Sequence, residues 1–214
     1  MTCYLHIGTP KTGTTSIQEF LYLNKNFFLD LGFYIPSSIG KKNHSRLAMM
    51  CADYTRPEHN IFKAYLNKHK IATKEDFVKH TNTIIETFKE ELKYVSQDKI
   101  IISSENIQET LQTEEEIIKL KNILNNLNFN KIYIILYIRR PEELMLSLYS
   151  MLIKAGYTDE RTIMNTPKHN VFFRHVCNHK ETLLRFSSIF GKKNIIVRKF
   201  EHNSFYESDL LKDF

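Results

Sequence analysis

Near its N-terminus the chain reads Tyr4-Leu5-His6-Ile7-Gly8-Thr9-Pro10-Lys11-Thr12-Gly13-Thr14-Thr15-Ser16. A short apolar strand is followed there by a glycine-bearing loop and the start of a helix. This order places backbone N–H groups and the positive end of the helix dipole around an anion. Gly8 and Gly13 allow a tight turn, because neither has a Cβ to keep the backbone away from a ligand. The segment therefore predicts a site for a phosphate-like group.

This loop departs from the loop of ATP-hydrolysing proteins. Gly8 and Gly13 have the spacing of a nucleotide-binding phosphate loop, but the Gly-Lys-Ser/Thr ending is missing. Thr14 stands at the position of that lysine, and the lysine of this loop, Lys11, lies between the two glycines. We therefore expect a phosphate-binding loop that is not built for ATP hydrolysis.

A second anion-binding pattern follows the apolar run 131–138. The run leads into Arg139-Arg140-Pro141-Glu142-Glu143, and Ser147 follows eight residues after Arg139. The Arg139 guanidinium offers a planar fork of donors that suits a phosphate, and Ser147 adds a hydroxyl two helical turns along. Arg140 could carry the contact instead, or simply face solvent.

The two patterns together resemble the signature of the sulfotransferase family, in particular its bacterial carbohydrate-type members. Residues 10–15 resemble the family's 5′-phosphosulfate loop, and Arg139-x-Pro141 with Ser147 resembles its 3′-phosphate motif, with Arg140 and Glu143 in place of the usual asparagine and aspartate. The resemblance implies 3′-phosphoadenosine 5′-phosphosulfate (PAPS) as co-substrate, 3′-phosphoadenosine 5′-phosphate (PAP) as product, and no metal. It implies these nucleotide-binding residues: Pro10, Lys11, Thr12, Gly13, Thr14, Thr15, Ser16, Arg139 and Ser147. Lys11 is also placed to stabilise the leaving phosphate.

Two residues are candidates for the general base that an acceptor hydroxyl needs. Glu105 follows the strand 99–102, at the place where the resemblance implies a histidine in cytosolic sulfotransferases. His44 lies in the region where Golgi-type relatives carry a glutamate. We favour Glu105, and the alternative readings are a cap of the next segment for Glu105 and an ordinary polar loop residue for His44.

The C-terminal motif that covers the adenine in sulfotransferases is not visible. The sequence runs only to Phe214, soon after the strand 194–199. Either another segment covers the adenine, with Arg198, Phe200 and Tyr206 as candidates, or the chain is truncated after Phe214.

Three unbroken runs of branched residues, 100–102, 132–138 and 195–197, indicate parallel strands that are covered on both faces. Helical patterns alternate with them and predict a doubly wound, mainly parallel α/β sheet flanked by helices, like that of phosphate-loop nucleotide hydrolases. We expect one domain over residues 1–214, with ligands beyond the carboxyl ends of the strands. The predicted helices are 16–31, 45–51, 74–96, 113–127, 141–155 and 171–190, with 33–36 as an extended piece.

The composition excludes several classes of protein but does not identify one. The chain has 214 residues, a net charge of +6 and three widely spaced cysteines, which argues against a disulfide framework or a zinc site. His6 is expected in the core, and His175 and His179 on a solvated helix face. The lysine-rich helices lack interleaved aromatic residues, which disfavours nucleic acid as a partner. Without a signal peptide or an apolar run long enough for a transmembrane segment, we expect a cytoplasmic protein, free or peripheral to the inner membrane face.

The sequence thus predicts a sulfotransferase acting on a hydroxyl or amine, with a carbohydrate or glycolipid as acceptor. Residues 37–73 and 156–170 are expected to shape the acceptor cleft. One alternative is a nucleotide or small-molecule kinase with a degenerate phosphate loop. Another is a non-catalytic nucleotide-binding protein on the same scaffold.

Overall fold

Five parallel strands form the centre of the molecule in a computed structural model that describes residues 1–56, 60–156 and 171–214. Their order across the sheet is β2-β3-β1-β4-β5. In chain order the strands are β1 (Thr2–His6), β2 (Phe33–Tyr34), β3 (Lys99–Ser103), β4 (Lys131–Ile138) and β5 (Ile195–Lys199). All of the pairings are parallel, which confirms the predicted sheet.

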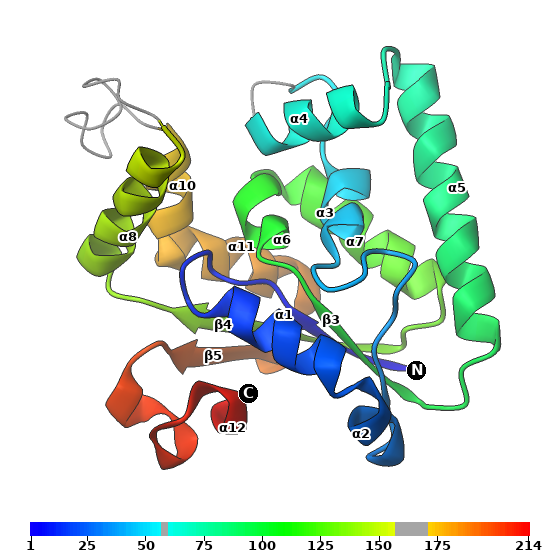
Figure 1. Cartoon of the computed structure of the whole chain (residues 1–214). Helices are drawn as coiled ribbons and strands as arrows, with labels where there is room; N and C mark the ends of the chain where they lie inside the picture. The colour runs from blue at the N-terminus through cyan, green and yellow to red at the C-terminus, as the bar shows by residue number, and fades with distance from the viewer. Residues whose placement is uncertain (57–59, 157–170) are drawn as a thin grey trace.

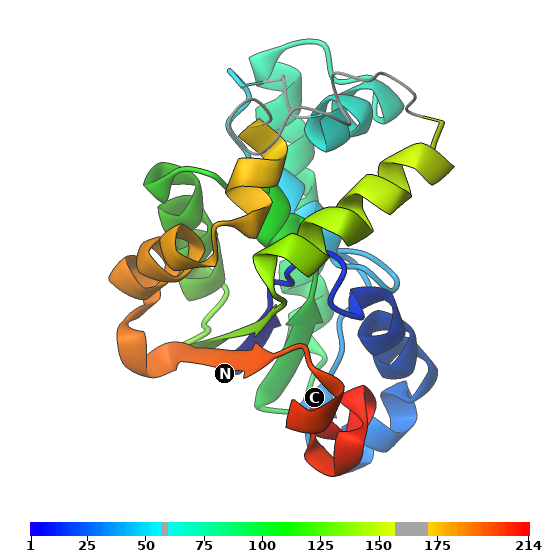
Figure 2. The same ribbon diagram turned by 90° about the vertical axis from the view of Figure 1, so that its left-hand side faces the viewer.

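Alternate residues of the strands supply two separate layers of core. Leu5, Ile102 and Ile134 face a large cluster that includes side chains from the helices α5, α7 and α11. Ile101 and Tyr137 face the other way and pack against α1 and the C-terminal segment. Figures 1 and 2 show helices on both sides of the sheet. A sheet buried on both faces accounts for the unbroken apolar runs of its strands.

Helices connect the strands and cover both faces of the sheet. Before β3 these are α1 (Thr14–Leu23), α2 (Lys25–Asp30), α3 (Ser45–Cys51), α4 (Asn60–Lys68) and α5 (Lys74–Lys93). After β3 they are α6 (Asn106–Thr110), α7 (Glu114–Asn126), α8 (Pro141–Lys154), α10 (Val171–Cys177), α11 (His179–Phe190) and α12 (Leu210–Asp213), with short 3-10 turns at Lys192–Asn194, His202–Ser204 and Tyr206–Ser208. The sequence pattern did not indicate α4, α6 or α12.

Two predicted helices are each broken at an asparagine. The predicted helix 16–31 divides into α1 and α2 at Asn24, whose side chain donates to the carbonyl oxygen of Phe20 at 2.8 Å. The predicted helix 171–190 divides at Asn178, whose side-chain oxygen accepts from the backbone N–H of Glu181 at 3.2 Å and caps α11. Asparagine side chains compete with the backbone for its hydrogen bonds, so both positions favour a break over a continuous helix.

The loop between β2 and α3 is anchored by one carboxylate. Glu91 of α5 accepts from the Tyr34 hydroxyl at 2.8 Å, from the backbone N–H groups of Ser37 and Ser38 at 2.8 and 3.1 Å, and from both of their hydroxyls. Burial opposes the charged form, but these hydrogen bonds outweigh burial and hold the pKa of Glu91 below its usual value. The base of the loop is therefore fixed.

Candidate functional site

The candidate site lies at the carboxyl ends of the strands, around the loop from Gly8 to Gly13. The loop continues β1 alongside β4, because the N–H of Thr9 donates to the Tyr137 carbonyl at 3.0 Å and the N–H of Tyr137 donates to the Gly8 carbonyl at 2.8 Å. Gly8, Lys11 and Gly13 all have positive φ angles, of 113°, 63° and 70°. These values turn the chain sharply before α1 begins.

The N-terminus of α1 is available to a ligand. Gly13 is its N-cap, and among the described residues no side chain caps the first turn. Thr15 and Gln18 therefore do not form a capping box at this end of the helix. Thr15 and Ser16 are exposed at this end of the helix, whereas Thr14 is buried. Uncapped N–H groups and the helix dipole together favour an anion here.

The inner side of the loop is held by its own threonines. The Thr9 hydroxyl donates to the Tyr137 carbonyl at 3.1 Å, and the Thr12 hydroxyl donates to the Thr9 carbonyl at 2.6 Å. Both side chains are fully buried, and Pro10 is buried as well. The Thr12 hydroxyl thus points into the protein, and only its backbone is placed to contact a ligand.

Arg139 lies against the loop, as the sequence pattern predicts. Its Nη1 atom is 3.5 Å from the Lys11 carbonyl oxygen, its Nε donates to Glu143 at 3.2 Å, and its guanidinium carbon lies 5.7 Å from the Phe200 ring centroid. Arg140, the alternative, is 65% exposed and pairs only loosely with Glu142 at 4.0 Å. Arg139 is therefore the arginine that reaches the site.

Ser147 is not brought to the loop in the same way. It lies on α8, two turns above the helix start and therefore about 9 Å along the axis. Among the described residues, no hydrogen bond joins its hydroxyl to Arg139 or to the Gly8–Gly13 loop. Its role toward a nucleotide stays a prediction.

Glu105 lies on the other side of the loop from Arg139. A Cβ added at Gly8 would come within 3.2 Å of the Glu105 Cα, so the carboxylate residue packs directly on the loop. Its Oε2 accepts from Gln18 Nε2 at 2.5 Å and from Asn43 Nδ2 at 3.2 Å. Because both donors bind the same oxygen, Oε1 keeps its lone pairs for another partner. The sequence pattern did not indicate Gln18 or Asn43, which come from segments far from Glu105.

His44, the second candidate for the general base, is instead a structural residue. It is fully buried, its Nε2 pairs with the Pro36 carbonyl at 2.9 Å, and its Nδ1 accepts from the Ser103 N–H at 2.8 Å. Burial lowers its pKa to about 4. Both ring nitrogens are occupied, so neither can take a proton from an acceptor.

A second carboxylate, Glu109, lies one helical turn from Glu105. It is 7% exposed and accepts a hydrogen bond from Asn106 at 3.2 Å. Burial, and then the nearby Glu105 charge, raise the pKa of Glu109 to about 7. At neutral pH the Glu109 carboxyl is therefore protonated in about half of the molecules.

Replacing Glu109 with glutamine should change how stability depends on pH. Because the pKa of folded Glu109 is about 7 and its ordinary value is 4.5, the folded state binds more protons between these pH values, and this group lowers the unfolding free energy as pH rises. The advantage of E109Q over wild type should therefore grow by about 3 kcal/mol across that range. Urea unfolding at several pH values measures it. An advantage that is constant from pH 4.5 to pH 7 would contradict the assignment.

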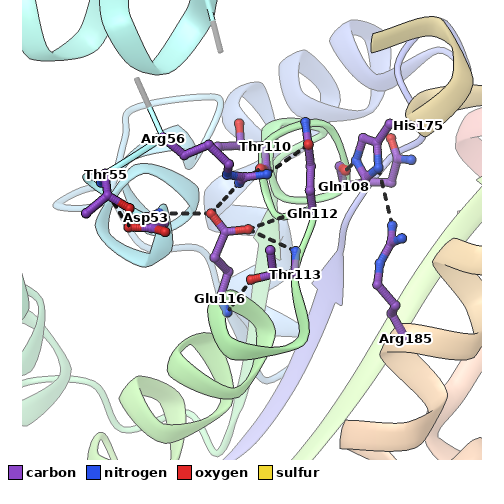
Figure 3. Close-up of polar contacts among 10 residues, drawn as sticks. All are labelled: Asp53, Thr55, Arg56, Gln108, Thr110, Gln112, Thr113, Glu116, His175 and Arg185. Atoms are coloured by element: carbon purple, nitrogen blue, oxygen red, sulfur yellow. Dashed lines mark hydrogen bonds and ion pairs between the residues drawn. The ribbon is translucent and has the colours of Figure 1, made fainter. Parts of the chain in front are cut away.

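The histidines His175 and His179 do not lie on a solvated face, so this prediction is wrong. The Nε2 of His175 pairs with the Gln108 carbonyl at 2.7 Å, and its Nδ1 lies 3.4 Å from Arg185 Nη2 (Figure 3). The Nε2 of His179 pairs with the Arg139 carbonyl at 2.7 Å. The two histidines instead tie α10 and α11 to α6 and to the start of α8. His6 is fully buried, as predicted.

Glu116 holds the far end of α6 in place. Figure 3 shows its carboxylate accepting from the backbone N–H groups of Gln112 and Thr113, at 2.7 and 3.0 Å, and from Arg56 at 2.6 Å. Thr113 and Glu116 also form a capping box at the start of α7. The buried carboxylate is thus paired on all sides, as a buried charge must be.

The C-terminal segment closes one side of the loop. Leu210 lies so close to Gly13 that a Cβ there would come within 2.3 Å of its Cδ2, and Phe200 lies 3.2 Å from the same position. Of the candidates for covering an adenine, Phe200 thus adjoins the site, Arg198 is paired with Asp213, and Tyr206 is 63% exposed. Their roles stay predictions.

A separate cavity of about 510 Å³ lies between α3, α5 and α7, next to Tyr54, Phe77 and Lys119. The loop, Arg139 and Glu105 do not line it. In the part of the chain that the structure describes, no three His, Cys, Asp or Glu side chains gather as a metal site would require, and no helix is long and apolar enough to cross a membrane. Of the predicted cleft segments, residues 57–59 and 157–170 lie outside the described residues.

Comparison with known proteins gives a likeness of fold. No family model and no curated protein sequence matches the chain. The crystal structure of a sulfotransferase from Alicyclobacillus acidocaldarius is similar over 94% of this chain and 73% of its own, with 14% identity and a TM-score of 0.53. A structure of the PezAT chromosomal toxin-antitoxin system of Streptococcus pneumoniae covers 93% of this chain and 67% of its own, with 18% identity and a TM-score of 0.43. The chain therefore has an α/β fold, with a five-stranded parallel sheet flanked by helices, that it shares with a sulfotransferase structure.

Proposed function

We propose that the chain is a sulfotransferase that moves the sulfuryl group of PAPS to a hydroxyl or amine of a carbohydrate or glycolipid. One observation carries the proposal: Arg139 and Glu105, which follow two different strands, both lie against the loop that carries Lys11. The fold likeness to a sulfotransferase structure supports it.

The nucleotide would be held at two points. The uncapped N–H groups at the start of α1, with the hydroxyls of Thr15 and Ser16, bind the 5′-phosphate. The Arg139 guanidinium binds the 3′-phosphate through charge-assisted hydrogen bonds. Glu143 pairs with Arg139 in the free protein and keeps the guanidinium oriented.

Sulfuryl transfer is an in-line displacement, in which positioning and charge stabilisation do most of the work. The acceptor oxygen forms a bond to sulfur while the bond from sulfur to the 5′-phosphate oxygen breaks. Glu105 takes the proton of the acceptor hydroxyl through its free Oε1, and Lys11 stabilises the negative charge that develops on the departing phosphate. The products are the sulfated acceptor and PAP.

Calorimetric titration with PAP, with ATP and ADP as controls, tests the donor class. We expect binding of PAP and much weaker binding of ATP and ADP, because Thr14 stands where ATP-binding loops have lysine. Binding of ATP and magnesium-dependent ATP turnover would favour the kinase instead.

The two-point model makes a specific prediction for Arg139. Arg139→Ala should weaken PAP binding by about 10- to 100-fold, because a hydrogen bond to a charged group contributes about 1.5–3 kcal/mol. Binding of adenosine 5′-phosphosulfate, which lacks the 3′-phosphate, should change much less. Calorimetry on both ligands measures the difference, and Arg140→Ala is the matched control. Equal losses for the two ligands would show that Arg139 does not read the 3′-phosphate.

A further inference from the structure

An exposed apolar stripe runs along the end of α1 and along α2. Leu23, Phe27 and Leu31 follow one another at intervals of four residues and are 69%, 57% and 53% exposed. Phe28, by contrast, packs toward the core beneath. Three large apolar side chains exposed at the end of α1 and along α2 indicate a surface that meets another partner.

Three lysines gather beside this stripe around a single aromatic ring. The Nζ atoms of Lys25, Lys41 and Lys42 lie 5.4, 5.4 and 5.0 Å from the Tyr22 ring centroid. Of these three lysines, only Lys42 forms an ion pair within the described residues, with Glu19 at 2.5 Å. The positive charges gathered around this ring make this part of the surface attractive to an anionic partner. Basic residues beside exposed Leu and Phe are typical of protein surfaces that lie on anionic membranes.

This surface borders the candidate base. Tyr22 lies one helical turn after Gln18, and Lys41 and Lys42 directly precede Asn43; Gln18 and Asn43 are the two residues that hold Glu105. Arg139 follows β4, on the other side of β1 from β3 and Glu105. The lysines therefore lie on the acceptor side and not on the nucleotide side.

We propose that Leu23, Phe27 and Leu31, together with Lys25, Lys41 and Lys42, bind the surface of an anionic lipid bilayer. Bound there, the protein presents Glu105 to acceptors carried by the membrane, which makes a lipid-linked hydroxyl compound the substrate class. The statement about the substrate rests on the proposed function; the binding of lipid does not.

Sedimentation with vesicles of phosphatidylcholine, with and without phosphatidylglycerol, tests the proposal. We expect binding to the anionic vesicles only. The triple variant K25Q/K41Q/K42Q should bind about 100-fold more weakly, because each lysine near an anionic surface contributes about fivefold. The triple variant K180Q/K192Q/K193Q, with the same charge change at exposed lysines at the two ends of α11, should bind nearly as wild type. The variant L23S/F27S/L31S should lose at least about tenfold, and I118S/L184S is its control.

Three outcomes would overturn the proposal: no preference for anionic vesicles, equal losses in the two lysine variants, or full binding by L23S/F27S/L31S. Thermal unfolding and PAP titration of each variant separate the two proposals. If the protein binds vesicles but not PAP, only the sulfotransferase proposal is rejected. If it binds PAP but not vesicles, only the lipid-binding proposal is rejected.

Discussion

Glu105→Gln should lower turnover by about 10²- to 10⁴-fold, the usual contribution of a general base. Glutamine has the same shape, and its side-chain oxygen can still accept from Gln18 and Asn43, so the loop geometry should persist. What is lost is the ability of Oε1 to take the acceptor proton. We therefore expect the loss in kcat, with KM for the nucleotide and PAP affinity nearly unchanged.

Sulfuryl transfer to the acceptor, followed by PAP release, measures this effect. Glu115→Gln, an exposed carboxylate on α7, is the matched control. Unchanged turnover in the Glu105 variant would remove Glu105 from the mechanism. If the variant is also largely unfolded at the assay temperature, the loss of turnover would mean that Glu105 is only structural.

Lys11→Ala should lower turnover by about 10²- to 10³-fold, as the loss of one group that stabilises transition-state charge does elsewhere. Lys11 is half-buried at the turn of the loop, and alanine and lysine tolerate its positive φ of 63° about equally. Folding should therefore persist, and PAP should still bind through the N–H groups at the start of α1 and through Arg139.

Steady-state kinetics and PAP calorimetry on the same preparation separate these effects. Lys192→Ala, an exposed lysine at the β5 side of the sheet, is the control. If the wild-type protein binds PAP but forms no more product than the Lys11 variant, this result would favour the alternative of a non-catalytic nucleotide-binding protein.

The sequence was sufficient to predict the parts of the fold that follow from local pattern. Unbroken apolar runs predicted the parallel strands, because both faces of the sheet are covered. Since the carboxyl ends of parallel strands meet at one edge, residues that follow β1, β3 and β4 had to approach one another. The placement of Arg139 beside the Lys11 turn follows from this rule.

Partners from distant segments could not be predicted in the same way. Gln18 and Asn43 reach Glu105 across 87 and 62 positions of sequence, and no periodicity marks such a pair. His44 and His175 look like polar surface residues in the sequence, yet each pairs with a backbone carbonyl in the interior. Tertiary hydrogen bonds therefore decide which of the candidate residues can do chemistry.

The Glu91 anchor has a consequence for how this protein can change over generations. Five donors fix the base of the loop, whereas the tip that carries Lys41 and Lys42 contributes little to that anchor. Mutations at the tip can accumulate without endangering the fold, and drift there would retune which surface is recognised while the chemistry stays intact. Related chains should therefore keep the glutamate and the two serines, while the lysines change only where the surface that the chain binds has changed.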